Sequence, residues 1–153
     1  MLSNYKKIKN LANKIKIANG SGNPFAIAKL NNIYIMEYNY KKQLGAFSIV
    51  NKIPFIFLNT NISDEEKRNV VAHELGHFFL HKKYLKDLLI LRDYSLFSKQ
   101  ENIMEMEANL FAGYLLVDTD ELSDKLLENK SIKELANYFS VDEKFIKLLI
   151  EYI

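Results

Sequence analysis

All three histidines of this chain lie within nine consecutive positions, and two of them frame the sequence His73-Glu74-Leu75-Gly76-His77. Side chains four positions apart project from the same face of an α-helix, so His73 and His77 can bind one metal ion together. Glu74 lies about 100° around such a helix, where its carboxylate can reach a water molecule beside the ion. This spacing is typical of hydrolytic zinc sites. We therefore predict that His73 and His77 bind Zn²⁺ and that Glu74 is the catalytic base.

A catalytic zinc ion usually has three protein ligands. The chain contains no cysteine, which leaves a carboxylate or His81 as the third. Three histidines spaced four apart span about 12 Å of α-helix, so we expect His81 to be a partly exposed side chain at the helix end, or at most a neighbour of the ligands. Glu105 is the predicted third ligand, because Asn109 on the same helical face could then hydrogen-bond a ligating histidine. Glu107 points about 200° away from Glu105 and is the alternative third ligand.

Two helices must hold these residues, and the sequence marks where each begins. Ser-x-x-Glu capping boxes occur at Ser63 with Glu66 and at Ser98 with Glu101. They predict one helix over about 64–82, which carries the histidines, and a second that carries Glu105. A glycine inside a helix costs about 1 kcal/mol relative to alanine, so Gly76 indicates that the two helices pack closely there. Small residues on the second helix match this gap: Ala108, Ala112 and Gly113.

Three segments rich in β-branched and aromatic residues precede the histidine helix, at 33–38, 46–50 and 53–58. The short gaps between them favour a small antiparallel meander of about three strands. Pro54 has no N–H to donate, so the third strand must begin there or lie at an edge. A small sheet directly before such a helix predicts an α+β, zincin-like fold, in which an edge strand binds extended substrate through backbone hydrogen bonds.

Both ends of the chain are predicted to be helical. Residues 1–52 contain nine lysines and one acidic residue, a net charge of +8, and we interpret the lysines of a helix over about 3–18 as its solvated face. Residues 118–153 form a helical subregion with a capping box from Ser131 to Glu134, and they resemble a helix-turn-helix pair. Five basic and nine acidic residues give this subregion a charge of −4, so we interpret it as a packing or partner-docking element. Direct nucleic-acid binding is therefore not expected.

Composition sets the class of protein. With 153 residues, 48% of them hydrophobic and 26% charged, we expect one globular domain over residues 1–153. No apolar run reaches the roughly 18 residues that a membrane span requires. The absence of cysteine agrees with a reducing compartment, so we expect a cytoplasmic protein. Residues 83–98 are mixed in composition and predict only a short helix over 84–91.

Several motifs recur together in one known family. The sequence HELGH is followed by Leu80-His81, then by Glu105-x-x-Ala108-Asn109-x-Phe111-Ala112 and Leu115-Leu116. With Asn23-Pro24-Phe25-Ala26-Ile27-Ala28 and Phe57-Leu58-Asn59, these motifs resemble the ImmA/IrrE family of zinc metallopeptidases over roughly residues 20–117. The family often continues Leu-Leu-Met-Pro, whereas Val117-Asp118 follow the two leucines here. This departure changes how the helix ends and leaves the metal residues untouched.

The resemblance implies that His73, His77 and Glu105 are zinc ligands and that Glu74 is the catalytic base. Members of the family act in phages, mobile elements and stress responses by cleaving helix-turn-helix repressors, which are often encoded next door. The resemblance therefore implies a zinc-dependent endopeptidase that acts as an anti-repressor. The alternative is a regulatory protein with a structural metal, which docks on a repressor without cutting it or binds DNA.

A peptidase mechanism also needs a donor for the oxyanion that forms at the scissile carbonyl. Glu74 would accept the proton of the attacking water and deliver it to the leaving amine. A second oxyanion donor besides the metal is usually present. The spacing leaves that role open between Tyr114 and His81.

Overall fold

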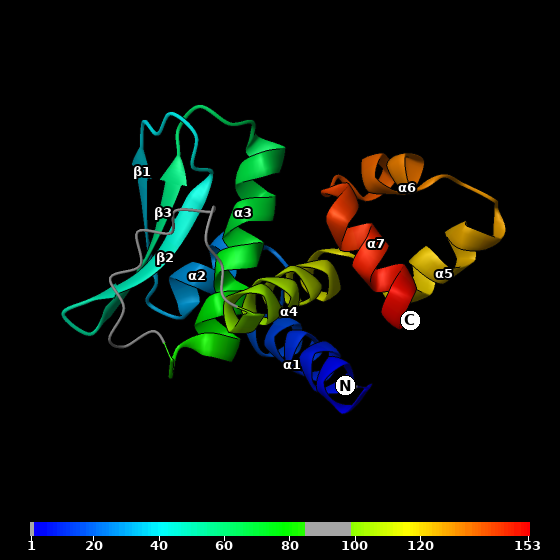
Figure 1. Ribbon diagram of the computed structural model, residues 1–153, viewed down its shortest axis with the longest axis horizontal. Coiled ribbons are helices and arrows are strands. Elements are labelled where there is room, and N and C mark those ends of the chain that lie inside the picture. The colour runs from blue at the N-terminus through cyan, green and yellow to red at the C-terminus, as the bar shows by residue number, and fades with distance from the viewer. Residues whose placement is uncertain (1, 85–98) are drawn as a thin grey trace.

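The computed structural model describes residues 2–84 and 99–153 of the chain. This part contains seven α-helices, one π-helix and three strands (Figure 1). In chain order they are α1 (Leu2–Asn19), α2 (Pro24–Leu30), β1 (Tyr34–Tyr38), β2 (Gly45–Val50), β3 (Ile53–Asn59), α3 (Asp64–Gly76), the π-helix η1 (His77–His81), α4 (Lys99–Leu116), α5 (Thr119–Leu127), α6 (Ile132–Phe139) and α7 (Glu143–Tyr152). The predicted α+β class is confirmed. The expected helix over 84–91 and the capping box at Ser98 fall largely outside the described residues.

The three strands form one sheet in the order β1-β3-β2. β2 and β3 pair antiparallel as predicted, through a tight turn at Asn51 and Lys52, which both have positive φ. The prediction of a meander is wrong for β1, which pairs parallel to β3 with Tyr34 opposite Phe55. The reason is that residues 39–44 carry the chain across β3, so that β1 and β2 lie on opposite sides of it. β3 begins at Ile53, next to Pro54, as expected.

Helix α3 lies between the sheet on one side and helices α5 to α7 on the other (Figure 1). The sheet covers α3 with its buried residues Phe47, Ile56 and Leu58. Helix α4 crosses α3 and contributes Leu110 and Phe111 to the same core. The histidine helix is therefore held from several sides, which fixes the direction of its side chains.

The two terminal regions pack on this core as the sequence predicts. Helix α1 buries an apolar face against α4, while its lysines Lys6, Lys7 and Lys14 are exposed. Helices α6 and α7 bury Leu135, Ala136, Phe145, Ile146 and Leu149, and Arg68 of α3 donates a hydrogen bond of 3.2 Å to the Ser140 carbonyl between them. No helix among the described residues is long and apolar enough to cross a membrane.

Two short helices each have a local signal: α2 was not predicted, and α5 lies within the helical subregion that was predicted over 118–153. Asn23 caps α2 by accepting from the Phe25 N–H, with Pro24 in the first turn. Asp118 caps α5 by accepting from the N–H groups of Asp120 and Glu121. The departure from Leu-Leu-Met-Pro thus places an N-cap directly after α4.

Candidate metal centre and catalytic cleft

The predicted capping box fixes the start of the histidine helix. Ser63 Oγ accepts from the Glu66 N–H at 3.2 Å, and Glu66 Oε2 accepts from the Ser63 N–H at 3.0 Å. Ten residues further along, His73 and His77 project from one face, and their Nε2 atoms lie 3.1 Å apart. His77 is fully buried and the His73 side chain is 12% exposed.

Glu105 of α4 faces both imidazoles. Its Oε2 lies 3.1 Å from His73 Nε2, and its Oε1 lies 3.1 Å from His77 Nε2. Ligand atoms held about 2.0–2.1 Å from a tetrahedral ion lie roughly 3.3 Å from one another, so these three side chains fit a zinc ion. The three residues form the group that could hold a metal among the described residues.

The charge of Glu105 suits this place. Burial alone would raise the pKa of its carboxyl, but hydrogen bonds and charge interactions with His73 and His77 outweigh burial and hold the pKa well below its ordinary value. The group therefore stays an anion, which is the form that binds a divalent cation.

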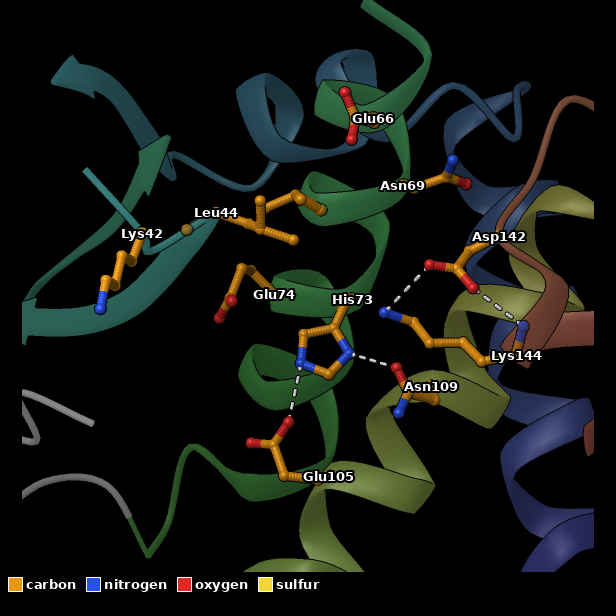
Figure 2. Close-up of a pocket in the computed structure, with 12 residues that line it drawn as sticks. Lys42, Leu44, Glu66, Asn69, His73, Glu74, Glu105, Asn109, Asp142 and Lys144 are labelled. Carbon is orange, nitrogen blue, oxygen red and sulfur yellow. Dashed lines mark hydrogen bonds and ion pairs between the residues drawn. The ribbon is translucent and has the colours of Figure 1, made fainter. Parts of the chain in front are cut away.

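Asn109 lies where the prediction requires it. Its Oδ1 is 2.8 Å from Nδ1 of His73, on the side of the ring opposite the candidate metal position (Figure 2). If Nε2 binds a metal, Nδ1 carries the proton and donates it to this oxygen. Asn109 is therefore placed where it could orient the His73 ring.

Glu107, the alternative third ligand, lies against a different histidine. Its Oε2 is 3.0 Å from His81 Nε2, while Glu105 occupies the position beside both other imidazoles. The expectation that His81 is a partly exposed side chain at the helix end is wrong, since this residue is only 3% exposed; it lies instead beside His77, as the other expectation allowed. It belongs to the π-helix η1, whose i→i+5 hydrogen bonds turn the side chain inward beside His77. Five residues of π-helix carry no sequence signal that we recognise.

The small residues of the two helices were predicted to face one another, and this holds in part. Gly76 lies directly against Ala108. Gly113 instead faces Leu149 of α7. It therefore allows the C-terminal helix, rather than the histidine helix, to approach α4.

A cleft of about 360 Å³ opens beside these residues (Figure 2). Glu74, 3% exposed, lines it together with His73, Glu105 and Asn109. The rest of its wall comes from three regions: Lys42, Leu44 and Gly45 before and in β2; Glu66, Asn69 and Val70 of α3; and Asp142 and Lys144 at the start of α7. The cleft therefore joins the sheet edge, the histidine helix and the C-terminal subregion.

Neither predicted oxyanion donor lies in this cleft. The Tyr114 hydroxyl is 3.5 Å from the Tyr152 carbonyl, and His81 is occupied by His77 and Glu107. Two lysines line the cleft instead, Lys42 and Lys144, and Figure 2 shows the Lys144 side chain reaching in from α7. Neither lysine was predicted, because both lie far from the HExxH motif in the sequence and no local pattern connects them to it.

Comparison with known proteins gives the same picture. Residues 28–150 match the IrrE N-terminal-like domain family of peptidases. The chain is 26% identical over 138 residues to metallopeptidase ImmA of Bacillus subtilis (strain 168), covering 89% of this chain and 79% of that protein. It is 31% identical over 98 residues to uncharacterized immunity region protein 2 of Bacillus phage phi105, covering 63% of this chain and 60% of the phage protein.

Proposed function

Because the chain belongs to the IrrE N-terminal-like domain family, it is a metalloprotease, and we propose that it is a zinc-dependent endopeptidase that cleaves a helix-turn-helix transcriptional repressor. The observation that carries the proposal is the convergence of His73 Nε2, His77 Nε2 and the Glu105 carboxylate at separations of 3.1 Å. We assign these three side chains as the metal ligands and Glu74 as the catalytic base.

A zinc ion held there would supply Lewis acidity, which polarises a peptide carbonyl and makes a water molecule more acidic. Glu74 accepts the proton of the attacking water and then delivers it to the leaving amide nitrogen. The carboxylate can act on water in the cleft because Glu74 lines its wall beside His73. Lys144 is the proposed second stabiliser of the oxyanion, because its ammonium group reaches into the same cleft.

The sheet provides a place for an extended peptide. Among the residues that the structure describes, β2 is an edge strand of the sheet and pairs with β3, and its first residue, Gly45, lines the cleft. A substrate segment that pairs with the outer edge of β2 would run past Glu74 and the metal ligands. Side chains of opposite charge along the wall, such as Lys42 and Glu66, would then select among peptides.

The substrate class rests on the kind of relative. One relative carries the name metallopeptidase ImmA, and the other is an immunity region protein of a phage. A peptidase of this kind would remove a repressor that maintains a mobile element. The anti-repressor function is thus the one that the motifs and the relatives support together.

Co-expression with a helix-turn-helix repressor encoded beside this gene tests the proposal. We expect a discrete repressor fragment with the wild-type chain and none with Glu74→Gln, which should keep the fold and the metal. Metal content measured on both purified proteins is the control. Full anti-repressor activity of Glu74→Gln would instead support the rival, a docking protein that does not cleave.

The geometry also supports a catalytic metal more than a structural one. Structural zinc sites are closed by four protein ligands, whereas catalytic sites keep one position open. Three candidate ligands converge here among the described residues, and two of them, His73 and Glu105, line an open cleft. This arrangement favours catalysis over a purely structural role.

A further inference from the structure

Behind the candidate metal centre, a row of polar side chains leads away from His77. His77 Nδ1 lies 3.1 Å from His81 Nδ1, and His81 Nε2 lies 3.0 Å from Glu107 Oε2. Asn4 Nδ2 then donates to Glu107 Oε1 at 2.8 Å. We call these four residues the polar row. It joins α1, the π-helix and α4, and its two histidines are almost completely buried.

Each hydrogen bond of the polar row has a direction that follows from the role proposed for His77. A metal takes the lone pair of Nε2, so the neutral ring carries its proton on Nδ1 and donates it to His81 Nδ1. His81, accepting at Nδ1, carries its own proton on Nε2 and donates it to Glu107. The Asn4 amide donates to the other carboxylate oxygen. In each of the three hydrogen bonds of the row, a donor thus faces an acceptor.

We propose that His81 and Glu107 are positioning residues, which hold His77 in the orientation and tautomer that bind the metal. This inference rests on the proposed metal centre. A carboxylate that accepts the outer N–H of a ligating histidine is a common way to orient the ring and increase its basicity. Here a second histidine is inserted between the ligand and the carboxylate. His73 is oriented separately, by Asn109.

The π-helix is the feature that makes this arrangement possible. In a continuous α-helix, His81 would continue the row of His73 and His77 along the helix axis. The wider turn of η1 brings the His81 ring beside His77 and directs its Nε2 to α4. π-Helical turns frequently occur at functional sites, in keeping with this role.

Zinc affinity of the full chain, measured by competition with a chromogenic chelator, tests the proposal. His81→Phe keeps an aromatic ring at this position but removes the acceptor for His77, so we expect zinc to bind about 10–100-fold more weakly. His81→Asn should recover most of this loss, because its Oδ1 can accept from His77 Nδ1. Glu107→Gln should cause a smaller loss than His81→Phe, and Asn4→Ala a smaller one still.

The graded order distinguishes positioning from a general loss of stability. Ile146→Val trims a fully buried residue of α7 away from the row, and it should lower stability without changing zinc affinity. Wild-type affinity in His81→Phe, or equal losses in His81→Phe and His81→Asn, would overturn the proposal. If His81→Phe does not fold, Glu107→Gln decides, and unchanged affinity in that variant overturns it.

The tautomers provide a second readout that does not depend on activity. The chain has only three histidines, so long-range ¹H–¹⁵N spectra of the zinc-loaded protein can be assigned directly. We expect the proton of His77 on Nδ1 and that of His81 on Nε2; a His81 proton on Nδ1 would contradict the row. A wild-type chain that binds no zinc would refute the metal centre itself, whereas tight binding unaffected by the variants would refute only the positioning role.

Discussion

Gly76 lies against Ala108 so closely that a Cβ atom on the glycine would be 2.8 Å from the Ala108 Cα atom and 2.9 Å from its carbonyl oxygen. Helices α3 and α4 cross at this contact. Gly76 immediately precedes His77, and Ala108 follows Glu105 by three positions. The contact lets the two backbones approach until the carboxylate of Glu105 reaches both imidazoles. A glycine that disfavours the helix locally is thus the residue that allows the site to assemble.

Replacing this glycine should loosen the site. In Gly76→Ala, helix propensity gains about 1 kcal/mol, but overpacking against backbone atoms costs roughly 1–3 kcal/mol. We expect a lower free energy of unfolding in urea and weaker zinc binding, because Glu105 is pushed away from the imidazoles. Gly113→Ala is the matched control, since its Cβ would meet only the Leu149 side chain at 3.1 Å. Equal zinc affinity in the two variants would contradict this account.

Loss of the Asn109 amide should weaken metal binding without removing a ligand. Asn109→Ala leaves the Nδ1 proton of His73 without its 2.8 Å partner, so we expect zinc affinity to fall about 10–100-fold. Asn109→Asp retains an acceptor and should bind more tightly than the alanine variant. Isothermal titration of zinc into each metal-free protein measures both, and identical affinities would rule out the orienting role.

Lys144 should affect turnover more than binding if it stabilises the oxyanion. We expect Lys144→Met to lower kcat by about 10-fold or more with little change in KM, as for the loss of an electrostatic donor. Lys147→Met, on the same helix but outside the lining of the cleft, is the control and should behave as wild type. A rise in KM alone would assign Lys144 to substrate binding instead.

The cap of α5 predicts how stability depends on pH. Hydrogen bonds from the N–H groups of Glu121 and Asp120 lower the pKa of Asp118 below its ordinary value. The ionised Asp118 cap therefore contributes about 1 kcal/mol to the free energy of unfolding. This contribution is fully present above roughly pH 4, the pKa of the group in the unfolded chain, and it is lost as the pH falls through the lower pKa of the folded protein. Urea unfolding should show a gap between wild type and Asp118→Ala that narrows on acidification. Asparagine at position 118 can cap the helix but does not titrate, so the difference in stability between Asp118→Asn and Asp118→Ala should not change with pH. A difference between wild type and Asp118→Ala that grows in acid would contradict this account.

Much of the candidate site could be read from local sequence. The HExxH spacing places His73 and His77 on one helical face, and the capping box at Ser63 marks where that helix begins, because both depend only on residues within a turn or two. Choosing Glu105 over Glu107 needed one more step, the expectation that Asn109 would meet a ligating histidine. The structure brings these residues together as that reasoning requires.

Other features depended on contacts between distant segments, and only the tertiary structure decided them. The parallel pairing of β1 depends on the path of the chain across β3, and the inward turn of His81 depends on a π-helix with Glu107 of α4 beside it. Lys144 enters the cleft because Leu149 packs α7 against Gly113. Spacing along one helix determines which side chains share a face, whereas packing between elements determines what that face meets.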